Sequence, residues 1–217
     1  MTTAENLNRI IQAKNDIKQA IENKGVTVGD MTIDKYAEKI DEISGKWIMP
    51  KGINFAGSTF YEFDGGQLDT TNLTNMSTMF SNCDALISFK AANWDTSNVL
   101  GMSYLFSSCY NLTSIDVAGW DTSKVTNMSN MFYKCSGLTS IDLSSWDMSN
   151  VTDMDYMFAY CENLREIRMG GDVSNVIDME YMFFNLPMSG TFYYNPAYDY
   201  SKIIEQLPKT WTAVPME

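Results

Sequence analysis

The 217-residue chain contains no histidine. Histidine is the commonest general base and metal ligand near neutral pH, so Ser-His and Cys-His nucleophilic pairs are excluded. The four cysteines also lack the short paired spacing of a zinc site, because each lies 26 residues from the next. The glycines show no phosphate-loop spacing. The sequence therefore predicts a protein that is not an enzyme and that carries no cofactor and no metal.

Basic residues are scarce, with 15 Lys and Arg against 27 Asp and Glu, for a net charge of −12. This balance argues against nucleic acid and against anionic membrane surfaces. No segment approaches the roughly 18 apolar residues that cross a bilayer. The first residues, "MTTAENLNRI", lack the apolar core of a signal peptide. We expect no nucleic-acid partner, no membrane insertion and no export, with the protein made in a cytoplasm and either kept there or released by lysis.

What the chain does have is a repeat of 26 residues. The segment "WDTSKVTNMSNMFYKC" (120–135) returns as "WDMSNVTDMDYMFAYC" (146–161), and a last copy follows after 25 residues with Leu186 in the place of Cys. Such a period is typical of a solenoid of the leucine-rich-repeat type. A single coil cannot bury its apolar face, so we expect the recurring residues to stack as ladders inside the solenoid.

Each repeat divides into segments of different periodicity. Alternation in "LTSIDL" (138–143) predicts a short strand, and the polar "SSWDMS" after it predicts a turn. The apolar residues that follow recur at steps of three and four, which predicts a short helix capped by Thr122 or Ser123; they are Val125, Met128, Met131, Phe132 and Cys135. The predicted fold class is α/β, a leucine-rich-repeat-like solenoid of about five strand-turn-helix coils with a short parallel sheet.

Residues 68–186 closely resemble the BspA-like leucine-rich-repeat family, also found in mycoplasma surface proteins, as in "LTSIDLSSWDMSNVTDMDYMFAYC" (138–161). The resemblance implies a right-handed solenoid with a parallel sheet on one side, used for adhesion and recognition without catalytic residues. Surface proteins of this family usually carry export signals and anchors, which are not visible here.

The segment "LNRIIQAKNDIKQAIENKGVTVGDMTIDKYAEKIDEI" (7–43) resembles a module at the front of bacteriophage tail and fibre proteins. It predicts helices over about 5–24 and 33–43. One apolar seam, interrupted by Lys14, either forms a short oligomerising coil or packs within a helical hairpin or against the first coil of the solenoid; its residues are Leu7, Ile10, Ile17 and Ile21. This part carries a net charge of −1 and the rest −11, which favours two parts with different roles.

We therefore predict four segments. Residues 1–46 form a helical attachment and oligomerisation module, and residues 47–67 a β-rich N-terminal cap. Residues 68–186 form the solenoid. Residues 187–217 form a C-terminal cap with a strand at 191–194, a helix at 200–207 and a strand at 211–214, because the open end of a solenoid must be covered.

Two surfaces are candidates for recognition. The exposed strand face presents Lys90, Asp116, Asp142 and Arg168. The helix side presents Tyr104, Tyr156 and Tyr181, with Tyr110, Tyr133 and Tyr160 close to the cysteines. Exposed aromatic side chains with short polar neighbours are typical of recognition surfaces, and the alternative is a solvated face with partly buried tyrosines.

Two internal ladders have alternative interpretations. One ladder consists of recurring aspartates, Asp95, Asp121, Asp147 and Asp172. They could form a calcium site, but we expect that each caps the segment that follows it. The cysteine ladder, Cys83, Cys109, Cys135 and Cys161, would place neighbouring Cα atoms roughly 5 Å apart, within disulfide range. Because no export signal is visible, we expect reduced thiols in the core.

The sequence predicts a non-enzymatic bacteriophage virion structural protein, a head or tail fibre or adhesin. Residues 1–46 would contact other virion proteins and form a dimer or trimer, and the solenoid would recognise a bacterial surface protein or glycan. The alternative is a bacterial cell-surface adhesin that lacks its export signal.

Overall fold

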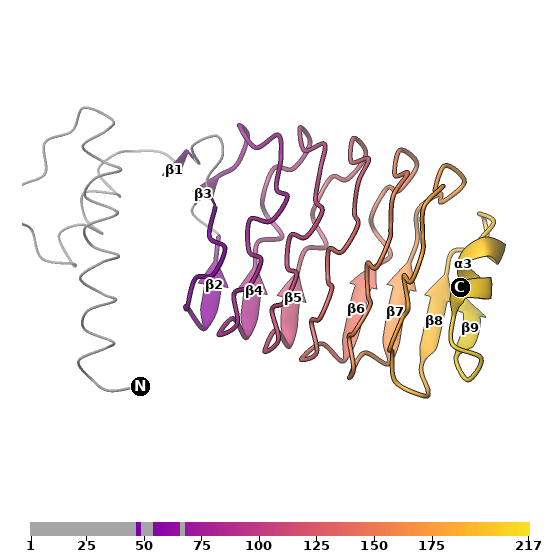
Figure 1. The fold of residues 1–217 in the computed structure, drawn as a ribbon. Coiled ribbons are helices and arrows are strands. Elements are labelled where there is room, and N and C mark those ends of the chain that lie inside the picture. Colours follow the sequence, from indigo (N-terminus) through magenta and orange to yellow (C-terminus); the bar gives the residue numbers. More distant parts are fainter. Residues whose placement is uncertain (1–46, 49–53, 66–67) are drawn as a thin grey trace, which may run out of the picture. The chain divides into compact units, whose positions relative to one another are not determined.

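Short strands from successive repeats lie parallel and in register. In the computed structural model, which describes residues 47–48, 54–65 and 68–217, they form a parallel β-solenoid of about five turns (Figure 1). Two further strands, β1 (Trp47–Ile48) and β3 (Leu68–Asp69), have two residues each. The predicted helices and the seam of residues 1–46 lie outside the described residues.

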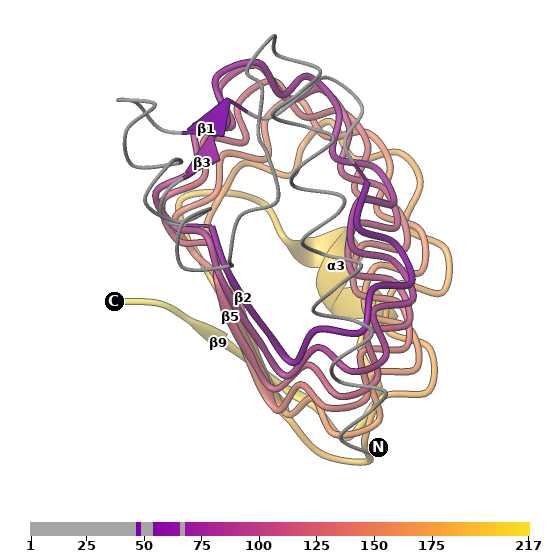
Figure 2. The same ribbon diagram turned by 90° about the vertical axis from the view of Figure 1, so that its left-hand side faces the viewer.

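Apart from β1 and β3, the described strands divide between two sheets. The first contains β2 (Glu62–Asp64), β4 (Ser88–Lys90) and β5 (Ser114–Asp116); the second contains β6 (Ser140–Leu143), β7 (Glu166–Met169), β8 (Thr191–Tyr194) and β9 (Thr212–Pro215). Each residue pairs with its counterpart one repeat later, as Ile141 pairs with Ile167. Figure 2, a view along the solenoid, shows the strands superposed on one side and the turns on the other. The predicted short parallel sheet is confirmed, with an interruption between β5 and β6.

The recurring apolar residues form the predicted ladders. Phe132 is buried between Phe106 and Phe158, with near-parallel rings whose centroids are 5.8 Å away on each side. Trp146 stacks on Trp120 at 6.0 Å, and its Nε1–H donates to the carbonyl of Val117 at 3.1 Å. Because this polar indole group is bonded, the tryptophan can be buried at little cost.

The predicted helix of each repeat is wrong, because residues 129–134 form consecutive turns after an isolated bridge at Asn127. Every second N–H from Met128 to Lys134 donates to a carbonyl of the next coil, at 2.7–3.0 Å, as Phe132 does to Met157. The N–H groups of Met131 and Tyr133 close turns across three residues, and that of Ser129 donates to the side-chain carbonyl of Asn127. In a helix, the alternate N–H groups that here donate to the next coil would donate to the carbonyl four residues earlier. The apolar residues of the turns nevertheless recur at nearly the same spacing as those of a helix.

The predicted helix cap is corrected for the same reason. The Thr122 hydroxyl donates to the carbonyl of Asp147 in the next coil at 2.8 Å, and the Ser123 N–H donates to the Asp121 carboxylate at 3.0 Å. These side chains stabilise a turn and the contact between coils.

The solenoid begins earlier than the sequence suggested. Phe55 stacks on Phe80 with centroids 5.2 Å apart, and its N–H donates to the carbonyl of Met79 at 2.7 Å. Gly57, at φ 71°, donates in the same way to Ser81. The segment 54–65 is therefore an incomplete first coil, which leads into β2 of the sheet.

The C-terminal elements lie where they were predicted. Strand β8, helix α3 (Ser201–Gln206) and β9 fall within one or two residues of the expected bounds. Among the described residues, α3 is the α-helix of the structure. Tyr200 takes the place of the repeat tryptophan, because its hydroxyl donates to the carbonyl of Gly171 at 2.6 Å.

Candidate recognition surfaces

The charged residues predicted on the strand face form two separate pairs. Lys90 lies beside Asp116 across β4 and β5, and Asp142 lies beside Arg168 across β6 and β7. The Arg168 Nε donates to the Glu166 carboxylate at 2.9 Å, and its guanidinium lies 4.1 Å from the ring centre of Tyr193. Arg168 is thus held within the sheet surface. The sequence analysis missed Tyr193, which lies in the C-terminal strand β8 outside the repeat.

A polar groove of about 490 Å³ lies where the sheet is interrupted. Asp116 lines it from β5, Asp142 from β6, and Glu166 and Arg168 from β7. None of the carboxylates in the described ranges gathers with others into a metal-binding group. The groove thus presents hydrogen-bonding groups and net negative charge at the middle of the solenoid.

The predicted tyrosines occupy one place on the turn side, but only two of the three meet. Tyr156 and Tyr181 stack with ring centroids 5.1 Å apart. Tyr104 is separated from them by the coil that carries Asn130, and 44% of its surface is exposed. The repeat therefore predicts where each tyrosine lies. Whether two of their rings touch depends on the residue that the coil between them carries at the same place.

Three further aromatic residues join this pair. Tyr133 lies 5.5 Å from Tyr160 between ring centroids, and Tyr160 lies 5.3 Å from Phe184. We call these five residues the aromatic cluster: Tyr133, Tyr156, Tyr160, Tyr181 and Phe184. Phe184 was missed, although it follows the core Phe183 as Tyr133 follows Phe132.

A cation lies over one edge of the aromatic cluster. The Lys134 Nζ is 5.2 Å from the ring centre of Tyr133 and 5.8 Å from that of Tyr160, within the range of a cation–π interaction. Loss of hydration, with Tyr181 and Glu180 nearby, raises the pKa of Tyr156 above its ordinary value. The phenol is therefore a neutral hydrogen-bond donor at physiological pH.

The backbone under the aromatic cluster is unusual. Tyr156, Tyr160 and Tyr181 have φ of 54°, 60° and 54°, a left-handed conformation that is rare for bulky side chains. In Tyr156 and Tyr160 it accompanies the contact between coils, since both donate their N–H groups to carbonyls of the next coil, at 2.9 and 2.8 Å. The rings are thus carried on a backbone fixed by the stack.

The repeats match a known family. Residues 74–191, more than half of the chain, match the family described as "Mycoplasma protein of unknown function, DUF285". The chain belongs to the DUF285 family. This is a mycoplasma and BspA-like repeat family. The prediction that residues 68–186 are BspA-like repeats is therefore confirmed. No curated protein and no solved structure gave a match, and the resemblance of residues 7–43 to phage proteins stays a prediction.

The aspartate ladder of this DUF285 chain caps turns. Each carboxylate accepts the N–H two residues further on, at 2.9–3.0 Å, in Asp95, Asp121, Asp147 and Asp172. Hydrogen bonds from the following serine lower the pKa of Asp95 and Asp121. The observed role is local stabilisation of the turn.

The prediction of reduced core thiols is confirmed. All four cysteines are free and buried, and each Sγ lies 3.0–3.2 Å from the carbonyl of a Phe in the coil before it. Burial raises the pKa of Cys135, and it raises that of Cys161 to about 12. The DUF285 thiols therefore act as small core residues that bond neighbouring coils. Within the described ranges, no helix combines the length and the apolar character that crossing a bilayer requires.

Proposed function

We propose that this DUF285 chain is a non-enzymatic recognition protein of a bacteriophage particle and that it binds a bacterial surface glycan. The aromatic cluster carries the proposal. Tyr181 is 52% exposed and Phe184 46% exposed, although both lie in ring contacts on the stack. Contiguous exposed aromatic groups on a folded surface mark interaction sites. These side chains have few rotatable bonds, so they lose little conformational entropy when a ligand binds.

The chemistry of the surroundings favours a sugar. A hollow of about 230 Å³ beside the aromatic cluster is lined by Tyr160, Tyr110, Lys134, Ser136 and Glu162. It is smaller than the roughly 300–1,000 Å³ of pockets for drug-sized ligands, so it suits one ring-sized group. A pyranose offers an apolar face for stacking on Tyr160 and hydroxyl groups for Lys134 and Glu162.

The virion setting rests on residues 1–46, through their resemblance to phage tail and fibre modules. In this proposal they attach the chain to other virion proteins and hold two or three copies together. Several copies would raise the avidity of a weak contact with a glycan. Mass spectrometry of purified phage particles should find the protein. Finding it on bacterial cells and not in particles would favour a cell-surface adhesin.

The glycan site is tested with full-length protein on a panel of immobilised bacterial surface polysaccharides. Tyr156→Asn and Tyr160→Asn keep a side chain that tolerates the left-handed backbone, but each removes one ring of the aromatic cluster. Each should weaken binding by about tenfold, since an aromatic contact contributes about 0.5–1.5 kcal/mol beyond area burial. The matched control is Tyr193→Ala on the strand face, which should bind normally. Equal binding by all four proteins, or binding to no polysaccharide, would contradict the proposal.

A further inference from the structure

Alternate N–H groups in the turn segment of one coil donate to the next coil, whereas the residues just before the segment bond back, as the N–H groups of Ile177 and Asp178 do to the carbonyl of Thr152. The N–H groups of Met154, Tyr156, Phe158 and Tyr160 donate to the carbonyls of Asp178, Glu180, Met182 and Phe184 in the next coil, at 2.8–3.0 Å. The same pattern links the earlier coils. Along this turn segment, each coil therefore presents carbonyls toward the N-terminal end of the stack and N–H groups toward its C-terminal end.

The last coil leaves its donors unused. The counterparts one repeat later are the N–H groups of Met179, Tyr181, Phe183 and Asn185, which have no acceptor in the part of the chain that the structure describes. The C-terminal cap extends the sheet through β8 and β9 but adds no further coil on the turn side. Four donors at every second residue therefore line an open edge.

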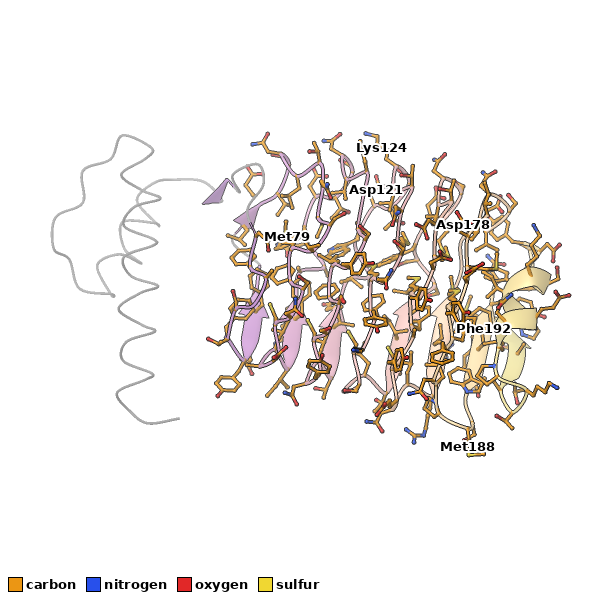
Figure 3. The ribbon with its side chains drawn as sticks, in the orientation of Figure 1. Met79, Asp121, Lys124, Asp178, Met188 and Phe192 are labelled. Atoms are coloured by element: carbon orange, nitrogen blue, oxygen red, sulfur yellow. The ribbon has the colours of Figure 1, made fainter. Side chains whose placement is uncertain are left out.

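A slot of about 700 Å³ runs along this edge. Residues 177–185 form one wall, and Gln206 and Pro208 from the C-terminal cap contribute to the other. Figure 3 shows Asp178 on the last repeat, next to the cap. The lining includes the exposed carboxylates Asp178 and Glu180 and contains no Lys or Arg. We call this feature the edge slot.

We propose that the edge slot binds an extended, basic peptide segment of a partner protein. The four backbone N–H groups along this edge are donors, so the occupant must bring acceptors to them. Asp178 and Glu180 disfavour an anion, which leaves neutral carbonyl groups of a peptide backbone. The same two carboxylates attract Lys or Arg side chains, and Tyr181 offers apolar contact to the residues between them.

A second copy fits this edge poorly. Two identical edges would place N–H groups against N–H groups. In a head-to-tail arrangement, the carbonyls of Met79 and Ser81 at the opposite end already accept from Phe55 and Gly57. That contact shows instead how a short segment outside the regular repeats continues the ladder. By analogy, an added strand of about seven residues presents four carbonyls on one side, at alternate positions.

The first test is amide hydrogen exchange of the full-length protein, measured by NMR. In the free chain, the amides of Met179, Tyr181, Phe183 and Asn185 should exchange at least about 100-fold faster than their bonded counterparts one coil earlier. Protection of these four amides in the free monomer would overturn the proposal. Protection that rises with protein concentration, together with oligomers in light scattering, would show that a second copy of this chain occupies the edge slot. The proposal of a partner peptide would then be wrong.

The second test uses two capped seven-residue peptides, one alternating Lys with Val and one alternating Glu with Val. The Lys peptide should bind saturably and slow exchange of the four amides, and the Glu peptide should not. The double change Asp178→Lys with Glu180→Lys should weaken binding of the Lys peptide by about tenfold or more, whereas Asp142→Lys on the strand face should not. Absence of saturable binding, or equal binding of both peptides, would overturn the proposal. Tyr156→Asn should leave peptide binding unchanged, which separates this site from the glycan proposal.

Discussion

Left-handed residues recur at two places in each turn segment. Ten non-glycine residues of the described chain have positive φ, and they include β-branched Thr78 and several tyrosines. Each left-handed residue is the third of a turn, which lets alternate N–H groups face the next coil. The cost of about 1 kcal/mol per residue is offset because every coil repeats the same bonds. Side-chain identity is therefore free to vary at these places, which leaves room for an aromatic surface.

Replacing Thr78 with Asn should raise the stability of the protein. Thr78 has φ 61° and is exposed, and Asn tolerates this conformation better than a β-branched residue. The native chain already has Asn130 at the equivalent place. Urea unfolding should show a gain of about 0.5–1 kcal/mol. The reverse change, Asn130→Thr, should lower the free energy of unfolding by a similar amount. A loss of stability in both variants would mean that backbone strain at positive φ does not determine the effect.

The buried thiols should make stability fall at alkaline pH. Burial raises the pKa of Cys161 from 9.0 to about 12, so the folded state holds this proton more tightly than the unfolded state does. The contribution is complete below about pH 9 and is lost as pH rises towards 12, at about 1.4 kcal/mol per pH unit. Urea unfolding between pH 8 and 11 should show a shallower decline for Cys161→Ala than for the native protein. Parallel declines would contradict the assignment.

At the scale of one coil, stability depends on the ladders. Phe132 lies in the middle of its stack, so Phe132→Ala should leave a cavity that neighbouring rings cannot fill. We expect a loss of about 3–5 kcal/mol. Asp142→Ala on the exposed strand face removes one turn bond, to Ser144, and should cost about 0.5 kcal/mol or less. Thermal and urea unfolding of both variants would check the assignment of inside and outside, and similar losses would show that it is wrong.

Strands and ladders could be predicted from the sequence because they follow simple periodicities. Ile141 and Leu143 alternate with exposed residues, and each pairs with its own counterpart. The helix could not be rejected in this way, because successive turns and a helix give nearly the same spacing of apolar residues. What decides between them is where the N–H groups bond, and that depends on the neighbouring coil. Phe55 was missed because its incomplete coil lacks the repeat's Cys and Met landmarks.

The candidate surfaces were predictable only in part. The repeat places Tyr156 and Tyr181 in one row, and their contact follows from the stacking of adjacent coils. The additional contacts of Tyr133 and Phe184 depend on the directions that the left-handed turns give to side chains, which no sequence periodicity reports. The interruption between β5 and β6, and with it the polar groove, has no sequence signal that we can identify.

For the whole molecule, the solenoid should fold without residues 1–46. Residues 48–217 form one compact unit, and the first coil at 54–65 continues the ladders of the repeats. A chain that starts at Trp47 should be a soluble monomer with native circular dichroism, and the full-length chain should form a dimer or trimer. Light scattering on both proteins measures this. Unfolding of the shorter chain would show that residues 1–46 cap the solenoid, and a full-length monomer would mean that Leu7, Ile10, Ile17 and Ile21 pack within the molecule.

The interruption between β5 and β6 has a mechanical consequence. In a solenoid, each coil is held by its neighbours alone, so the resistance of the column to tension is that of its weakest interface. Strand bonds are missing at this interface, while bonds on the turn side continue across it, as from Phe106 to Met131. Under a pulling force along the column, the strand side should part here first, with the turn side as a hinge. The solenoid should therefore yield to tension by bending at its middle before any coil unwinds.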